Sequence, residues 1–206
     1  MNTKGYFSYI VNEIHTTIAA TVDDDNHPVT CAIDMMDYDE NSLYFLTATG
    51  KNFYDRLKKQ EYLAFTALKG EDTLHSVAIS VRGKVRELGP YQVEKLLEKN
   101  TYMYEIYPTE ESRTALTVFQ MYEGTGEWFD LRTKPVERAS FSFGNEELGF
   151  SGYYVNDMCI ACRRCRDACP QNCIDFSDGT AEIIAEHCLR CGNCAEVCPE
   201  GAIEKM

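Results

Sequence analysis

Eight of the ten cysteines follow one spacing, and the chain uses it twice. Each copy reads C-x2-C-x2-C-x3-C-P, so three closely spaced cysteines are followed by a fourth and then by a proline. The first copy comprises Cys159, Cys162, Cys165 and Cys169, and the second comprises Cys188, Cys191, Cys194 and Cys198. This run is typical of pairs of 4Fe–4S clusters. The spacing therefore indicates one-electron transfer chemistry.

In such a run the fourth cysteine ligates the other cluster, which gives two ligand sets. We expect the first cluster site to comprise Cys159, Cys162, Cys165 and Cys198, and the second to comprise Cys188, Cys191, Cys194 and Cys169. Zinc is the alternative, because C-x2-C pairs also form structural zinc sites. Those sites are usually built from two separated pairs, and a triple spacing suits tetrahedral zinc poorly. The pattern therefore favours iron–sulfur clusters.

Two cysteines are left over. Cys173 fits neither ligand set, and Cys31 lies on an expected strand. Free cysteines are often small buried residues, and we expect both to be buried. For Cys173 the alternative is a ligand exchange or a redox role.

Residues 153–206 resemble a bacterial two-cluster ferredoxin over their whole length, through the segments 159–165, 169–174, 188–194 and 198–203. The resemblance implies a pseudo-twofold domain that transfers electrons at low potential. Arg163 departs from the repeat, because Gly192 stands at the equivalent position. If that position needs a positive φ, arginine costs about 1 kcal/mol there. Its charge, with those of Arg164 and Arg166, either raises the potential of the nearer cluster or is solvated on an exposed loop.

Charge and hydropathy narrow the function further. The formal net charge of −13 argues against a nucleic-acid binder, which needs a basic face. The acidity serves solubility or steers a basic redox partner. The sequence contains no run of 18 apolar residues, so no membrane span is predicted. The first residues lack the pattern of a signal peptide. We therefore expect a cytoplasmic protein, in which many cysteines indicate metal chemistry rather than disulfides.

The cysteine content also divides the chain. Residues 1–143 contain only Cys31, whereas the other nine cysteines fall between residues 159 and 198. The segment 144–152 between them holds three glycines, which leave a backbone loose. We expect an N-terminal domain over 1–143, a linker over 144–152 and a two-cluster ferredoxin domain over 153–206.

The N-terminal region alternates short apolar strands with turns. A short helix is expected over residues 6–14, and Asn52 is expected to cap a second helix over 53–59, with a third over 91–99. Strands are expected over 16–22, 29–36, 43–47, 62–68, 76–87 and 116–122. Residues 126–144 read as an aromatic connecting segment. Short strands joined by tight turns predict an antiparallel barrel, so the chain is of the α+β class.

Residues 6–90 resemble the FMN-binding split barrel of the pyridoxamine 5′-phosphate oxidase-like superfamily. The order of a few short segments carries the resemblance: Ile18–Val22, Leu43–Lys51, Phe53–Leu57 followed by Tyr62–Leu68, and Ala78–Val85. It implies bound FMN and a homodimer with the flavin in the interface. The oxidase's own arginine and lysine correspond to Cys31 and Met36 here, and its glutamine corresponds to Ala78. We therefore do not expect oxidation of pyridoxamine phosphate.

The turn Thr47-Ala-Thr-Gly-Lys51 follows a strand and precedes a helix. Hydroxyls, free backbone N–H groups and a lysine converge there, which suits a phosphate. The alternative is an ordinary capping turn. The resemblance adds the backbone of Ile33 and Asp34, so the expected flavin-binding residues are Ile33, Asp34, Thr47, Ala48, Thr49, Gly50 and Lys51.

Two further residues are weighed against simpler roles. His75 precedes the long strand and is the candidate to face the flavin or substrate; the alternative is a partly exposed histidine. Trp128 either covers the flavin or packs in the core.

These features together predict an FMN- and iron–sulfur-dependent oxidoreductase of an anaerobic cytoplasm. Electrons would pass between the two 4Fe–4S clusters and FMN, and to or from a small molecule or a partner protein. The alternative is a non-catalytic electron carrier whose barrel is a docking module, or binds a deazaflavin or haem.

Overall fold

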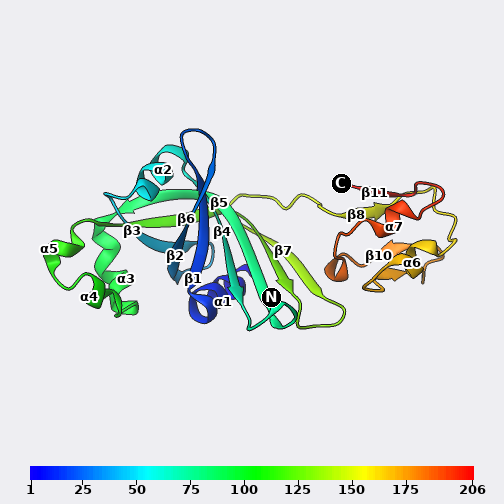
Figure 1. Cartoon of the computed structure of the whole chain (residues 1–206), viewed down its shortest axis with the longest axis horizontal. Coiled ribbons are helices and arrows are strands. Elements are labelled where there is room, and N and C mark those ends of the chain that lie inside the picture. Colours follow the sequence, from blue (N-terminus) through cyan, green and yellow to red (C-terminus); the bar gives the residue numbers. More distant parts are fainter. The chain divides into compact units, whose positions relative to one another are not determined.

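The computed structural model describes residues 1–206, which fall into two compact units (Figure 1). The barrel unit comprises residues 1–69, 78–127 and 140–147. The cluster unit comprises residues 70–77, 128–139 and 148–206, so it contains the C-terminal region together with two stretches from earlier in the chain.

One sheet of seven strands, in the order β3-β2-β1-β4-β5-β6-β7, carries the barrel. A further pairing between β3 and β6 closes the first six strands into a ring, which confirms the predicted barrel. The strands are β1 (Thr16–Val22), β2 (Pro28–Tyr38), β3 (Leu43–Ala48), β4 (Tyr62–Lys69), β5 (Val77–Gly89), β6 (Leu116–Asp130) and β7 (Glu137–Phe143). The pairings of β1 with β2 and β4, and of β3 with β2 and β6, are antiparallel.

Side chains of the barrel strands alternate between its two faces. Along β1, Thr17, Ala19 and Thr21 are buried, whereas Ile18 and Val22 lie on the outer face. This alternation follows from the two-residue repeat of a strand. Inside, the rings of Phe45 and Phe119 stack with centroids 5.6 Å apart. Each such buried ring contributes about 1.5–3 kcal/mol of hydrophobic free energy.

The helices of the barrel unit are short. They are α1 (Thr3–Tyr9), the π-helix η1 (Ile10–Ile14), α2 (Asn52–Gln60), the 3₁₀ turn η3 (Pro90–Gln92), α3 (Val93–Lys99), α4 (Met103–Ile106) and α5 (Glu110–Arg113). The prediction that Asn52 caps α2 is wrong. Lys51 is the N-cap, with an extended backbone and no side-chain cap, and Asn52 is already helical. Leu96 and Leu97 of α3 pack into a buried cluster with Leu46 and Val118.

The largest departure from the prediction is the length of β6. It runs to Asp130, and β7 follows, so the expected connecting segment 126–144 is mostly strand. Glycines normally weaken a strand, so the glycine-containing end of β6 was not predicted as a strand from the sequence. Here they permit a close crossing, because a Cβ on Gly124 would lie 2.2 Å from the carbonyl oxygen of Arg82.

The cluster unit consists of short elements around the cysteine loops. They are η2 (Thr73–His75), β8 (Tyr153–Val155), α6 (Arg164–Ala168), β9 (Ile174–Asp175), β10 (Glu182–Ile183), η4 (Ala185–His187), α7 (Asn193–Glu196) and β11 (Ile203–Lys205). Strand β8 pairs with β11, and β9 pairs with β10. Helices α6 and α7 each start inside a cysteine run, so the unit repeats one loop-and-helix arrangement.

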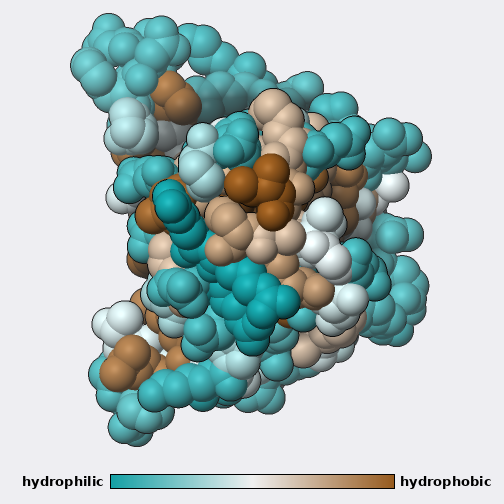
Figure 2. All heavy atoms as spheres, turned by 90° about the vertical axis from the view of Figure 1, so that its right-hand side faces the viewer, coloured by the Kyte–Doolittle hydropathy of each residue, from teal (hydrophilic) through white to brown (hydrophobic).

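One face of the molecule is mainly hydrophilic. On the face shown in Figure 2, teal residues predominate and brown apolar residues form small separate groups. No helix is both long enough and apolar enough to cross a membrane.

Candidate functional site

The first cluster site lies in a pocket of the cluster unit. The pocket is lined by all four predicted ligands, Cys159, Cys162, Cys165 and Cys198. Cys198 reaches it from the end of the second cysteine run, as the crossed ligand set requires. Ile160 and Phe176 also line the pocket, so the thiols converge in apolar surroundings.

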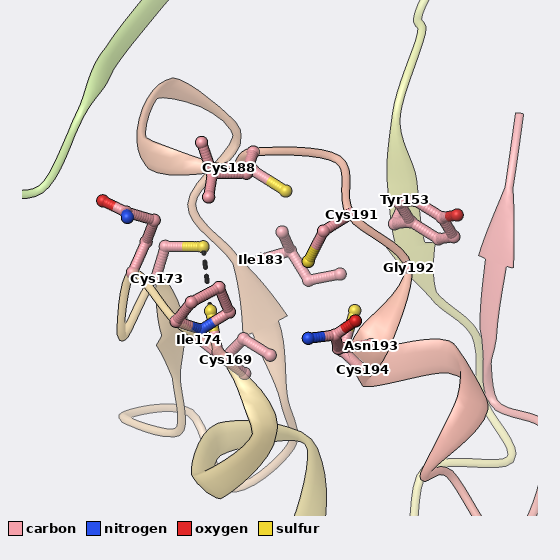
Figure 3. A pocket seen from close by; sticks show the side chains of 13 residues that line it. Tyr153, Cys169, Cys173, Ile174, Ile183, Cys188, Cys191, Gly192, Asn193 and Cys194 are labelled. Atoms are coloured by element: carbon pink, nitrogen blue, oxygen red, sulfur yellow. Dashed lines mark hydrogen bonds between the residues drawn. The ribbon is translucent and has the colours of Figure 1, made fainter. Parts of the chain in front are cut away.

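The second cluster site has the same construction. Figure 3 shows Cys188, Cys191, Cys194 and Cys169 around one pocket. Cys169 comes from the first cysteine run, so the two runs exchange their fourth cysteines. The structure thus brings each predicted set of four thiols together, which is the arrangement that two cubic clusters need.

The two loops share an unusual backbone. Ala161 and Arg163 have φ values of 54° and 66°, and the equivalent Arg190 and Gly192 have values of 59° and 86°. Arg163 therefore adopts the left-handed conformation that glycine adopts more easily, as the sequence comparison of the runs required. Left-handed turns place successive N–H groups near an anion. The Arg190 N–H, for example, lies 3.3 Å from the sulfur of Cys188.

The ten cysteines are all free thiols in the structure, and burial acts on several of them. It raises the pKa of Cys194 to about 11 and also raises the pKa of Cys165. Burial opposes ionisation of Cys169 too, but backbone N–H groups from Cys173 and Gln171 outweigh it and lower the pKa of that thiol. A bound metal centre supplies the positive charge that keeps such buried thiols ionised.

The ninth cysteine of this region is buried, as expected. Cys173 is 3% exposed, and its sulfur lies 3.5 Å from that of Cys169, within the second pocket (Figure 3). Burial raises its pKa, so it is a neutral thiol beside a ligand. The two cysteines are only four residues apart, and the ligand-exchange alternative weighed for Cys173 requires this proximity.

The predicted phosphate turn links β3 to α2 in the barrel unit. The N–H of Thr49 donates to Ala115 and that of Lys51 to Ala48, which fixes the turn. Thr49, Gly50 and Lys51 are exposed, and a Cβ on Gly50 would meet no atom within 4 Å. The turn therefore has open space in front of it.

The hydroxyl of Thr47 is not exposed, although the sequence predicted it to be available to a phosphate. The residue is 3% exposed, and its hydroxyl oxygen is buried without a hydrogen-bond partner. A buried polar group left unpaired costs about 1–3 kcal/mol. The exposed hydroxyl of the turn is that of Thr49, and Ala48 supplies only backbone groups.

Arg56 is a residue of this site that the sequence reasoning missed. Its Nε donates to the hydroxyl of Thr21 at 2.7 Å. Arg56 and Lys51 both lie close enough to Cys31 to favour its thiolate, although burial outweighs them and raises the pKa of that thiol. Neither cation pairs with a carboxylate. The signal in the sequence was that Arg56 has no acidic residue three or four positions away.

Cys31 itself is only half-buried, so the prediction that it belongs to the core is wrong. It lies on β2 opposite Ala19, on the side where Lys51 and Arg56 approach. Two unpaired cations, a helix start and open space therefore converge near one stretch of β2, and this set suits a phosphate monoester.

Ile33 and Asp34 follow on the same strand. The Ile33 carbonyl accepts a hydrogen bond from the Thr17 hydroxyl at 3.0 Å. The Asp34 carboxylate is already engaged, because it accepts hydrogen bonds from Thr16 and Tyr102. Only the backbone of Asp34 matches the role expected for it.

His75 is an exposed residue of η2 in the cluster unit. Its side chain is 73% exposed, and its Nδ1 lies 2.8 Å from the Asp72 carboxylate. This is the exposed-histidine alternative. Trp128 is 7% exposed and takes the core role.

Comparisons with known proteins agree with both parts. Residues 158–202 match the family model described as a 4Fe-4S dicluster domain. A crystal structure of a NimC/NimA family protein from Clostridium acetobutylicum superposes with a TM-score of 0.55 at 16% identity, covering 68% of this chain and 92% of that one. No curated protein sequence matches the chain.

Two further structures share the barrel. A protein from C. acetobutylicum, related to general stress protein 26 and placed in the pyridoxinephosphate oxidase family, has a TM-score of 0.51 at 17% identity, covering 65% of this chain and 89% of that one. A haem-binding protein from Mycobacterium smegmatis has a TM-score of 0.53 at 9% identity, covering 69% and 59%. The chain therefore joins a split barrel of the pyridoxamine 5′-phosphate oxidase type to a C-terminal 4Fe–4S dicluster domain.

Proposed function

We propose that the protein is an oxidoreductase in which electrons pass between two 4Fe–4S clusters and an FMN bound by the barrel. The electrons then go to, or come from, a small molecule or a partner protein. The observation that carries the proposal is the presence, in one chain, of two crossed cysteine sets and of a split barrel with an open cationic turn. A flavin accepts electrons singly and releases them as a pair, which suits one-electron clusters.

Three features of the barrel unit support FMN. Lys51 and Arg56 are cations without carboxylate partners, the start of α2 offers backbone N–H groups, and the buried Thr47 hydroxyl lacks a protein partner. Lys51, Arg56 and the N–H groups of the turn would hold the phosphate of the cofactor. Bound there, FMN would supply the two-electron redox step that the clusters cannot perform alone.

The outer face of β1 and β4 supports a homodimer. It carries Ile18 and Leu68, which are 54% and 62% exposed, together with Tyr62, Val22 and small or hydroxyl residues. None of these outward residues is charged, although the chain as a whole carries −13. An uncharged sheet face with exposed apolar side chains in an acidic protein suits a second copy of the same chain.

Cofactor analysis of the anaerobically purified protein tests the proposal. We expect about eight iron atoms and eight sulfides for each chain, as two 4Fe–4S clusters require, and one FMN. A protein that contains iron–sulfur clusters but no flavin would contradict the proposal and would favour the alternative of a non-catalytic electron carrier. A haem Soret band or a deazaflavin spectrum would show that the barrel binds one of those cofactors in place of FMN.

A further inference from the structure

The two cysteine runs repeat each other, so each residue beside the first cluster site has a counterpart beside the second. The repeat aligns Met158 with His187 and Glu200 with Gln171. Both sites are built on the same loop-and-helix arrangement. A difference in exposure between two counterparts therefore reflects what other part of the chain contacts one site and not the other.

The end of the β6–β7 hairpin contacts the loops of the second site. This end belongs to the cluster unit, as part of residues 128–139. The Val136 N–H donates to the side-chain oxygen of Gln171 at 3.0 Å, and the Val136 carbonyl lies 2.9 Å from His187 Nδ1. Val136 is 6% exposed, and Leu189 beside it in the loop is only partly exposed. The chain therefore covers this face of the second site itself.

The equivalent face of the first site is open. Met158 and Glu200, the counterparts of the two residues that hold Val136, are exposed. Met158 is 53% exposed, and Ile160, the counterpart of Leu189, is 61% exposed. The ligand between them and the next helix, Cys162, is exposed as well. Neighbouring exposed apolar side chains are typical of a surface that binds another protein.

Two arginines adjoin these apolar side chains. Arg163 and Arg164 follow Cys162 directly in the sequence, and both are exposed. Neither forms an ion pair with a carboxylate of the chain, and the Arg163 guanidinium lies over an aromatic ring of the same unit. Their counterparts in the second run are a glycine and an asparagine. The first site therefore differs from the second in positive charge as well as in exposed apolar surface.

The local charge favours an acidic partner. Residues 157–167 carry three arginines and two aspartates, whereas the equivalent residues 186–196 carry one arginine and two glutamates. Glu200 also borders the first pocket, so the surface is not uniformly basic. Arginine binds carboxylates through two parallel hydrogen bonds. Because the chain as a whole carries −13 and repels acidic proteins, these arginines direct such a partner to the first site.

We propose that a small acidic redox protein docks on this surface, which comprises Met158, Ile160, Arg163 and Arg164, and exchanges electrons with the first cluster. The inference rests on the proposed electron-transfer function. One electron passes between the cluster and the redox centre of the partner, so that one is oxidised as the other is reduced. No bond forms or breaks, and no proton is transferred.

Binding of two redox proteins of opposite charge tests the proposal. The oxidised holoprotein is titrated anaerobically in a calorimeter with an oxidised plant-type 2Fe–2S ferredoxin, which is acidic, or with oxidised cytochrome c, which is basic. Oxidised partners exchange no electrons, so the heat reports binding alone. We expect the ferredoxin to bind with a dissociation constant in the micromolar range. Binding should weaken as salt is added, because salt screens exposed charges.

The charge variant gives the first run the residues of the second. It combines Arg163→Gly with Arg164→Asn, and glycine suits this position because Arg163 has a φ of 66°. This variant and Ile160→Ser should each raise the dissociation constant of the ferredoxin about tenfold. Glu200→Gln should lower that constant, because it removes the carboxylate that repels the partner. The affinity for cytochrome c should not fall in the charge variant.

Matched controls come from the barrel unit. Arg82→Gln combined with Lys95→Gln removes two exposed cations, and Ile106→Ser removes an apolar side chain that is 60% exposed. Both should bind the ferredoxin as the wild type does. A wild type that does not bind the ferredoxin would overturn the proposal, and so would losses in the controls equal to those in the variants.

Sedimentation velocity of the holoprotein alone identifies the other occupant that would overturn the proposal. If Ile160→Ser changed the oligomeric state, a second copy of the chain would occupy the surface. Iron and flavin contents are measured first. A protein without flavin would contradict the proposed function and would leave this test unchanged, because the docking surface lies within the cluster unit.

Discussion

The sulfur atoms of Cys169 and Cys173 lie 3.5 Å apart, although only Cys169 belongs to a ligand set. The pair sits at the edge of the second cluster site, together with Cys188 (Figure 3). A neutral thiol this close to a ligand affects how any test of the ligand assignment must be designed, because it could replace the ligand.

The crossed assignment predicts which cluster each substitution removes. Cys198→Ser should abolish the first cluster, and Cys169→Ser combined with Cys173→Ser should abolish the second, because serine oxygen is a poor ligand for iron–sulfur clusters. In each case the iron content should fall by about half. Cys173→Ser alone is the control and should keep both clusters. Iron analysis and electron paramagnetic resonance of the reduced protein provide the measurements.

The grouping of the eight cysteines into two sets of four could be predicted, because their spacing along short loops brings each set to one pocket. The barrel was predictable from alternating strands, apart from the glycine-rich end of β6. The phosphate turn was predictable only in part. Arg56 and Cys31 come together through the packing of α2 against β1 and β2, and a local pattern does not encode that contact. The strained backbone conformation of His15 could not be predicted from the sequence either.

The cationic turn predicts weaker FMN binding when either charge is removed. Lys51→Met and Arg56→Met should each raise the dissociation constant for FMN at least tenfold, since a charge-assisted hydrogen bond contributes about 1.5–3 kcal/mol. Lys59→Met is the control, because Lys59 lies on the same helix and pairs with Asp24. Flavin fluorescence in titrations gives the constants. A control variant as weak as the other two would contradict the assignment.

The uncharged sheet face predicts the oligomeric state. Ile18→Asp should convert a dimer into a monomer, because a carboxylate would be buried without a partner in the interface. Ile106→Asp is the control, since Ile106 on α4 is a similarly exposed apolar residue, 60%, away from β1 and β4. Sedimentation velocity distinguishes the states. A wild type that is monomeric at micromolar concentration would rule out this interface.

The contribution of Glu87 to the free energy of unfolding is expected to depend on pH. Burial opposes its ionisation, but hydrogen bonds from Thr117 and Lys58 outweigh burial and lower its pKa below the ordinary value of 4.5. Its contribution is therefore present above about pH 4.5 and is lost as the pH falls through the lowered value. Glu87→Gln should cost about 1 kcal/mol at pH 7, and the difference from the wild type should shrink below pH 4.5.

Urea unfolding followed by circular dichroism measures that difference. Glu40→Gln is the control, because Glu40 is largely exposed and pairs only with Lys4. A difference between wild type and Glu87→Gln that stays constant with pH would show that the lost hydrogen bonds, and not the ionised carboxylate, matter.

Electron exchange between the clusters and the flavin within one molecule tests the central claim most directly. The oxidised holoprotein is mixed anaerobically with less than one equivalent of dithionite, and the cluster and flavin absorbances are followed over time. The account predicts that both centres approach a common equilibrium at a rate independent of protein concentration. A flavin that stays oxidised while the clusters are reduced, or a rate that rises with protein concentration, would contradict it.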